Sequence, residues 1–260
     1  MSTYPDLHNK VYIVTGGGSG MGRATCKALA AEGARVVLGN RNPVEGEATA
    51  AEIRAAGGQA VFRQTDVSRA ADCAALVACA LEHFGRLDGA FNNAGLQREF
   101  CDIHETPDAD ISDVIDINLK GMLYMMKYEA EAMLVSGGGS IVNVGSILSL
   151  TADPFLTSYT ATKHGVLGLT RALAVDYASA GIRANCVLPG DMETPMILEY
   201  FAASDDPEAT RKEMEDAYPI KRIARPREVA QAVLFLASDE SSFVSGAELL
   251  VDGALTVKAY

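Results

Sequence analysis

Short apolar runs alternate with longer segments of helical composition along almost the whole chain. The first run, at 11–16, is rich in β-branched residues and stops at a glycine. Continuous apolar runs of this length are typical of strands that are buried on both faces of a parallel sheet. The pattern predicts strands at about 11–16, 34–40, 60–67, 87–93, 140–146, 182–190 and 248–253.

Helices are predicted between these strands, because several of the intervening segments open at proline or close at glycine. They cover about 23–34, 43–58, 69–84, two helices within 107–136, the segment that carries Tyr159, and 226–237. The alternation predicts one doubly wound (Rossmann-type) α/β domain over 1–260, with a mostly parallel, seven-stranded sheet. A polar stretch at about 191–220 is expected to form a substrate lid. Ligands of such sheets bind at the carboxyl ends of the strands.

Composition narrows the class of protein and the compartment. Lysine and arginine number 22 against 34 acidic residues, so the net charge is −12 and nucleic acid is not an expected partner. Five cysteines without a Cys-x-x-Cys pair favour reduced thiols and a cytoplasmic protein. Four dispersed histidines give no metal-ligand spacing, so no metal is expected. No apolar stretch approaches the roughly 18 residues of a membrane span, so no membrane partner is expected.

Tyr159 and Lys163 stand four residues apart in the segment SYTATKHG. If this segment is helical, both side chains lie on one face and point into the same cavity. A neighbouring cation stabilises a phenolate, so the lysine is expected to lower the pKa of the tyrosine toward neutrality. Taken alone, the pair is more typical of an ordinary surface contact.

The glycine-rich turn TGGGSGMG follows the first predicted strand and precedes a predicted helix. Glycines there let the backbone approach a pyrophosphate, whose charge is met by N–H groups at the helix N-terminus. The position between strand and helix favours a nucleotide site over a plain turn. The contacts predicted for this turn are made by Gly16, Ser19, Gly20, Met21 and Gly22.

The residues at the ends of the second and third predicted strands are expected to contact the adenosine half of such a cofactor. Asn40 stands where NAD-binding proteins place an acidic residue, and Arg41 follows it. An arginine there can pair with a 2′-phosphate, so NADP is preferred and NAD remains the alternative. Arg41 could instead stack on the adenine or face water. Asp66 and Val67 are expected at the adenine, although an aspartate that only opens the next helix is a comparable interpretation.

Six ordered features now resemble the classical short-chain dehydrogenases/reductases, from about residue 10 to 254. They are TGGGSGMG, NNAG at 92–95, Asn118, Ser146 thirteen positions before Tyr159, Tyr159 with Lys163, and PGDMETP at 189–195. The resemblance implies a catalytic tetrad of Asn118, Ser146, Tyr159 and Lys163. It also implies cofactor contacts by Tyr159, Lys163, Asn93, Ala94, Gly95, Pro189, Gly190, Met192 and Thr194, and a homotetramer with dihedral symmetry. Asp191 departs from the family, which more often has a bulky or neutral residue there.

The resulting expectation is an NAD(P)-dependent oxidoreductase that interconverts a secondary alcohol and its ketone, with Tyr159 as general acid/base. Gln97, Leu148, Phe155 and Met196 are candidates for the substrate pocket. Their mainly apolar character suggests an alicyclic, aromatic or steroid-like small-molecule substrate. A non-catalytic NAD(P)-binding sensor on the same fold is the main alternative, and a sugar dehydrogenase is a further one. An epimerase or dehydratase acting on a nucleotide sugar would need a larger C-terminal region than this chain has.

Overall fold

The computed structural model describes residues 3–259, so the two ends of the predicted domain, 1–2 and 260, lie outside the described residues. Seven strands form one parallel sheet in the order β3-β2-β1-β4-β5-β6-β7. This confirms the predicted doubly wound fold, and the sheet is parallel throughout. The strands are β1 (Val11–Thr15), β2 (Arg35–Asn40), β3 (Gln59–Gln64), β4 (Gly89–Asn92), β5 (Gly139–Val144), β6 (Ile182–Pro189) and β7 (Glu248–Val251).

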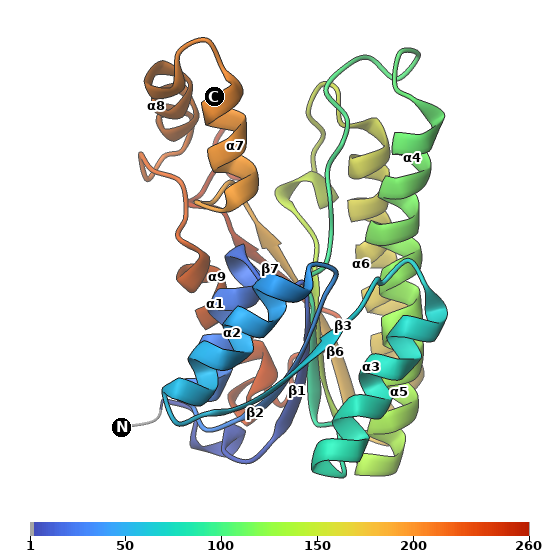
Figure 1. Cartoon of the computed structure of the whole chain (residues 1–260). Helices are drawn as coiled ribbons and strands as arrows, with labels where there is room; N and C mark the ends of the chain where they lie inside the picture. Colours follow the sequence, from blue (N-terminus) through green and yellow to red (C-terminus); the bar gives the residue numbers. More distant parts are fainter. Residues whose placement is uncertain (1–2, 260) are drawn as a thin grey trace.

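Helices cover both faces of this sheet (Figure 1). On one face lie α1 (Gly20–Ala31), α2 (Pro43–Ala55) and α9 (Pro226–Ala237). On the other face lie α3 (Ala70–Phe84), α5 (Gly121–Ser136) and α6 (Thr157–Tyr177), with α4 (Asp108–Ile115) beside the upper part of α6.

Strand β1 shows why the first apolar run is continuous. Val11 and Ile13 belong to the core shared with α3, α5 and α6, whereas Tyr12 and Val14 belong to the core shared with α1, α2 and α9. Alternate side chains of a strand point to opposite faces, so a strand covered on both sides must be apolar at every position.

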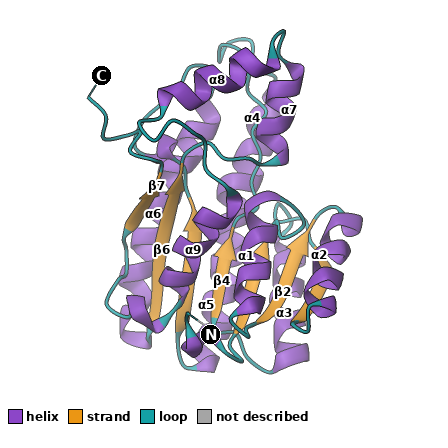
Figure 2. Ribbon diagram, turned by 90° about the vertical axis from the view of Figure 1, so that its left-hand side faces the viewer, coloured by secondary structure: helices purple, strands orange, loops and turns teal. Residues whose placement is uncertain are grey.

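The stretch predicted as a lid contains two helices, α7 (Pro195–Ala203) and α8 (Pro207–Ala217). They stand above the carboxyl ends of the strands (Figure 2). Each begins with proline at its first position, and Asp206 caps α8 by accepting a bond from the Ala209 N–H at 3.0 Å. Phe201 of α7 forms a separate small core with Tyr218 and Ile223, and Met214 of α8 packs against it.

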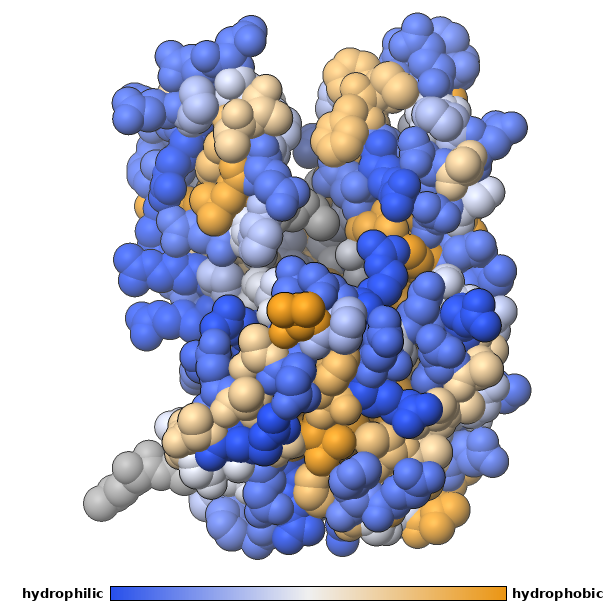
Figure 3. Space-filling view, in the orientation of Figure 1, coloured by the Kyte–Doolittle hydropathy of each residue, from blue (hydrophilic) through white to orange (hydrophobic). Residues whose placement is uncertain are grey.

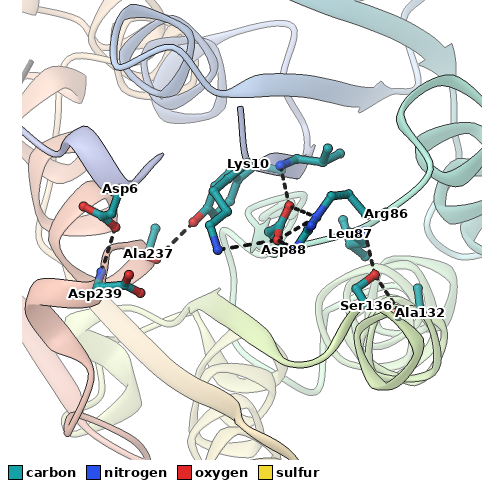
Figure 4. Close-up of polar contacts among 11 residues, drawn as sticks. Asp6, Lys10, Arg86, Leu87, Asp88, Ala132, Ser136, Ala237 and Asp239 are labelled. Carbon is teal, nitrogen blue, oxygen red and sulfur yellow. Dashed lines mark hydrogen bonds and ion pairs between the residues drawn. The ribbon is translucent and has the colours of Figure 1, made fainter. Parts of the chain in front are cut away.

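The amino end of the sheet is fastened by the buried carboxylate of Asp88 (Figure 4). One of its oxygens accepts the Val11 N–H at 2.9 Å, and both accept hydrogen bonds from the Arg86 guanidinium. Lys10 adds an ion pair at 3.7 Å. The carboxylate therefore joins the beginnings of β1 and β4.

Candidate active site

A cavity of about 490 Å³ opens at the carboxyl ends of the strands. It lies where the connections from β1 and β4 leave on opposite sides of the sheet, the position at which doubly wound sheets bind ligands. Figure 3 shows a notch between two lobes at this end of the molecule. The predicted site residues that line the cavity are Gly16, Ser19, Gly20, Met21, Asn40, Arg41, Asp66, Val67, Asn93, Ala94, Gly95, Gln97, Ser146, Leu148, Tyr159, Lys163, Pro189, Gly190, Met192 and Thr194.

Three predicted residues are not among the cavity walls, and a fourth cannot be placed. Gly22 lies behind the glycine turn, where a Cβ would stand 2.1 Å from the Gly16 carbonyl oxygen. Asn118 lies behind the wall, and Phe155 is half exposed on the loop before α6. The side chain of Met196 lies outside the described residues.

The glycine turn fits a dinucleotide. Gly16 and Gly20 adopt left-handed backbone angles, with φ of 65° and 49°, that favour glycine. A Cβ on Gly18 would stand 2.4 Å from the Asn40 side-chain nitrogen and 2.9 Å from the Glu45 Cβ, so a side chain there would require these neighbours to move. Ser19, Gly20 and Met21 bring the start of α1 to the cavity, where its N–H groups suit a pyrophosphate.

Asn93 ties the end of β4 to this turn. Its amide nitrogen donates to the carbonyls of Thr15 at 3.0 Å and of Gly16 at 3.2 Å. The Thr15 hydroxyl accepts the N–H groups of Asn93 and Ala94, both at 3.0 Å. The predicted cofactor residue Asn93 therefore holds the ends of β1 and β4 together on the cavity wall.

The adenosine end contains a group that the sequence analysis missed. Glu45, in the first turn of α2, lines the cavity beside Asn40 and Arg41. The Asn40 amide donates to the Asn42 carbonyl at 3.0 Å and to a Glu45 carboxylate oxygen at 3.4 Å. An acidic side chain thus shares this rim with the Arg41 cation.

The Asp66 side chain stabilises a local turn and also lines the cavity. One of its carboxylate oxygens accepts the Ser68 N–H at 3.0 Å and the Ser68 hydroxyl at 2.7 Å. This is a turn that precedes α3, whose N-cap position is Arg69, so Asp66 does not cap the helix as the alternative expected. Because Asp66 and Val67 also line the cavity, a contact with a base there remains a prediction.

Ser146 is held in place by the start of a short 3₁₀ helix after β5. Its hydroxyl oxygen accepts the Leu148 N–H at 3.1 Å, and its own N–H donates to the Ser149 hydroxyl oxygen at 3.1 Å. The Ser149 hydroxyl donates in turn to the Lys163 carbonyl at 2.8 Å. Ser146 is thereby fixed relative to the helix that carries Tyr159 and Lys163.

Burial changes the pKa values of Tyr159 and Lys163. The Lys163 Nζ donates to the Val144 carbonyl at 3.1 Å and lies 5.4 Å from the centre of the Tyr159 ring. Burial lowers the pKa of Lys163 to about 8. Burial also raises the pKa of Tyr159 to about 12, although a hydrogen bond with Ser146 lowers it. The desolvation of the phenolate therefore raises the pKa of Tyr159 in the protein alone, in the direction opposite to the expected lowering.

Asn118 lies in a π-helical turn, Asp116–Lys120, between α4 and α5. Its side chain is buried and bonds the Leu96 backbone twice, accepting the N–H and donating to the carbonyl, each at 2.8 Å. This amide pair holds the loop after NNAG against α4 and α5. Such single π turns inside helices are frequent at functional sites.

Glu99 is a second residue that the sequence analysis missed. Its buried carboxylate accepts the N–H groups of Ser158 at 2.9 Å and of Tyr159 at 2.8 Å. Leu156 occupies the N-cap position of α6 and has no side-chain acceptor, so Glu99 supplies the negative charge that a helix N-terminus favours. An acidic or hydroxyl side chain at the N-cap position would have signalled this role, but Glu99 lies about 60 residues away.

Asp191, the departure from the family pattern, lines the cavity half-buried. The Tyr218 hydroxyl donates to one of its carboxylate oxygens at 2.9 Å and accepts the Asp191 N–H at 2.6 Å. Burial raises the pKa of Asp191, and the charge of Asp153 raises it further, whereas the Tyr218 bond lowers it.

Residues 3–259 contain no group of three or more histidines, cysteines or acidic residues placed to hold a metal ion. Across the same residues, no helix is long and apolar enough to cross a membrane.

Comparisons with known proteins agree with the fold. A family model described as "Enoyl-(Acyl carrier protein) reductase" matches residues 16–256. Cyclohexanol dehydrogenase of Acinetobacter sp. (strain SE19) is 43% identical over 252 residues, covering 97% of each chain. The 2,5-dichloro-2,5-cyclohexadiene-1,4-diol dehydrogenase of Sphingobium indicum is 42% identical, covering 96% of this chain and 98% of its own. The crystal structure of levodione reductase superposes with a TM-score of 0.93 at 35% identity, covering 97% of this chain and 99% of its own.

The chain belongs to the short-chain dehydrogenase/reductase family. It is an oxidoreductase that acts on CH–OH groups. Members of this family use NAD(P), and the glycine turn and cavity described above fit such a cofactor.

Proposed function

We propose that the protein interconverts a secondary alcohol and its ketone, with Tyr159 as the general acid/base. The observation that carries the proposal is that Ser146, Tyr159 and Lys163 line the same cavity as the glycine turn. Bound NAD(P) would supply or accept the hydride, while the chain positions the substrate oxygen and moves its proton.

Each side chain has a defined task in this proposal. Ser146 holds the substrate oxygen by a hydrogen bond, because its own oxygen is fixed by the Leu148 N–H. Tyr159 is protonated at neutral pH, with a pKa of about 12, which is the form that donates to a ketone oxygen. Lys163 brings a positive charge beside the tyrosine and favours the phenolate that donation leaves behind. Asn118 acts as a positioning residue through its two bonds to Leu96.

The proposed substrate is an alicyclic alcohol or ketone. Leu148, Leu156 and Ile197 give the cavity apolar walls near the serine and tyrosine. The named activities of the relatives on cyclohexanol and a cyclohexadienediol support a six-membered ring. Gln97 also lines the cavity and is proposed as a polar contact of the substrate.

The test is a screen of alicyclic alcohols and ketones with NAD and NADP, followed at the absorbance of the reduced nicotinamide. Tyr159→Phe is expected to lower turnover about 10³-fold, because proton transfer typically contributes 10² to 10⁴-fold. Cofactor affinity, measured by fluorescence titration, should stay within about twofold because the ring remains. Tight cofactor binding without turnover of any compound would instead support a non-catalytic sensor.

The proposed cofactor preference is NADP, and it depends on Arg41. The guanidinium is exposed at the cavity rim and suits a 2′-phosphate, while the Glu45 carboxylate on the same rim opposes one. Arg41→Ala should weaken NADP binding about tenfold and leave NAD binding nearly unchanged, whereas Glu45→Gln should favour NADP. Equal dissociation constants for the two cofactors in the unchanged protein would contradict the preference.

We also propose that helices α7 and α8, within the predicted 191–220 segment, form the substrate lid. Ile197 of α7 lines the cavity, and α8 contributes no buried residue of its own. Hydrogen exchange over this segment should slow when cofactor and substrate analogue bind. Unchanged exchange would exclude a closing lid.

A homotetramer in the cytoplasm is the proposed assembly and location. β7 is an edge strand of the sheet, and Phe243 in the segment before it is fully exposed, features that an interface between copies would cover. All five cysteines are free thiols, in keeping with a reducing compartment. Light scattering tests the assembly, and a monomer at micromolar concentration would refute it.

A further inference from the structure

Three polar side chains interrupt the apolar walls around Tyr159. Asp153 lies on the loop between β5 and α6, Asp191 follows β6, and Gln97 follows β4, and all three line the cavity. A pocket for a plain hydrocarbon ring needs none of them, because a polar group that loses water without a partner costs free energy. Their presence indicates that the substrate brings hydrogen-bonding groups beyond the reacting oxygen.

Only one of the two carboxylate oxygens of Asp191 has a hydrogen-bond partner among the described residues. The buried Tyr218 hydroxyl and the bond from the Ala224 N–H to the Asp191 carbonyl fix the residue from behind. Among residues 3–259, the only hydrogen bond to its carboxylate is the one from Tyr218, and no lysine or arginine forms an ion pair with it. Within the described residues, the second carboxylate oxygen of this cavity-lining residue therefore accepts no hydrogen bond.

The charge of this region is also one-sided. Asp153 is close enough to Asp191 for its negative charge to raise the pKa of Asp191, and Asp191 does the same to Tyr159. An anionic group of a substrate brought into this cavity would be repelled by both carboxylates. A neutral hydroxyl would instead donate a charge-assisted hydrogen bond, which is about twice as strong as a neutral one.

We propose that Asp191, together with Asp153, selects alicyclic alcohols that carry a second neutral hydroxyl, such as ring diols, and rejects those that carry a carboxylate. This inference rests on the proposed function and adds a substrate class to it. The same two residues then determine specificity without taking part in hydride or proton transfer.

The experiment compares kcat/KM for cyclohexanol, the 1,2-, 1,3- and 1,4-cyclohexanediols and 4-hydroxycyclohexanecarboxylate. The unchanged protein should prefer at least one diol to cyclohexanol and should use the carboxylate least. Asp191→Asn keeps an acceptor for Tyr218 and removes the charge. It should lower the ratio of diol to cyclohexanol efficiency about tenfold and raise the ratio of carboxylate to cyclohexanol efficiency. Asp153→Asn should shift the second ratio in the same direction by less.

Asp176→Asn is the matched control, since Asp176 is exposed near the end of α6, and it should change neither ratio. Unchanged ratios in Asp191→Asn would overturn the inference while turnover of cyclohexanol upheld the proposed function. A weaker cofactor affinity with equal losses for all substrates would also overturn it, by placing Asp191 at the cofactor. Failure of the proposed function looks different, because the unchanged protein would then turn over none of these compounds.

Discussion

At the amino end of the sheet the buried Asp88 carboxylate meets two cations and a backbone N–H, and Figure 4 shows them converging on it. At the carboxyl end the buried Lys163 ammonium donates to one carbonyl and, within the described residues, forms no ion pair. Burial of a paired charge is tolerated, whereas burial of an unpaired one costs stability. The first end stabilises the fold, and the second keeps a charge available for chemistry.

The backbone shows the same contrast. At the carboxyl end, Phe155, Lys221 and Ala254 adopt positive φ values of 64°, 58° and 69°. These residue types are strained in the left-handed region, and such strain gathers at functional sites. Before β1, at the amino end, the position with positive φ is Asn9, a residue type that tolerates it.

The largest expected effect comes from Lys163→Met. Turnover should fall about 10³-fold, since the positive charge beside Tyr159 is lost. The free energy of unfolding at pH 7 should rise, by up to about 3 kcal/mol, because an unpaired buried charge is removed. Steady-state kinetics and urea denaturation test the two changes, with Lys27→Met as the exposed control.

The pH dependence of stability sharpens this prediction. The pKa of Lys163 is lowered from 10.5 to about 8 by folding, so between these values the unfolded chain binds more protons. The free energy of unfolding that Lys163 contributes should therefore rise with pH across that window. The difference in stability between the Met variant and the unchanged protein should shrink over the same window. A constant difference would show that Lys163 is not an unpaired buried cation.

Asp88→Ala should have the next largest effect, on stability alone. Removal of the carboxylate leaves Arg86 and the Val11 N–H without their acceptor, which should cost about 3 kcal/mol in the free energy of unfolding. Turnover per folded molecule should be unchanged, because the cavity lies at the opposite end of the sheet. Asp176→Ala serves as the exposed control. A loss of kcat larger than the loss of folded protein would contradict the separation of the two ends.

Glu99→Gln should lower kcat about tenfold with little change in KM, because one of the two N–H bonds and the charge at the start of α6 are lost. Glu99→Ala should lower kcat further and also reduce the melting temperature. Equal kcat in the glutamine variant and the unchanged protein would mean that the position of Tyr159 does not depend on this carboxylate.

The smallest expected effect concerns the positive φ angles at the two ends of the sheet. Ala254→Gly should raise the free energy of unfolding by about 0.5 kcal/mol, because relief of left-handed strain slightly exceeds the added entropy of the unfolded chain. Asn9→Gly at the amino end should give no gain. Thermal denaturation of both variants tests the difference, and an equal gain at the two positions would remove the contrast in strain.

The sequence by itself determined the parallel sheet, the glycine turn, and the order of Ser146, Tyr159 and Lys163. These features depend on residues close together in the chain. The continuous apolar run of β1 indicates a strand covered on both faces, and the glycines after it indicate a turn. Both patterns follow from local backbone geometry.

Only the tertiary structure decided how these residues are held and charged. Glu99 reaches Tyr159 across 60 positions, and Tyr218 reaches Asp191 across 27. No local pattern encodes such bonds, because they form only when the loops pack together. The pKa directions at Tyr159 and Lys163 likewise follow from burial, which spacing alone does not reveal.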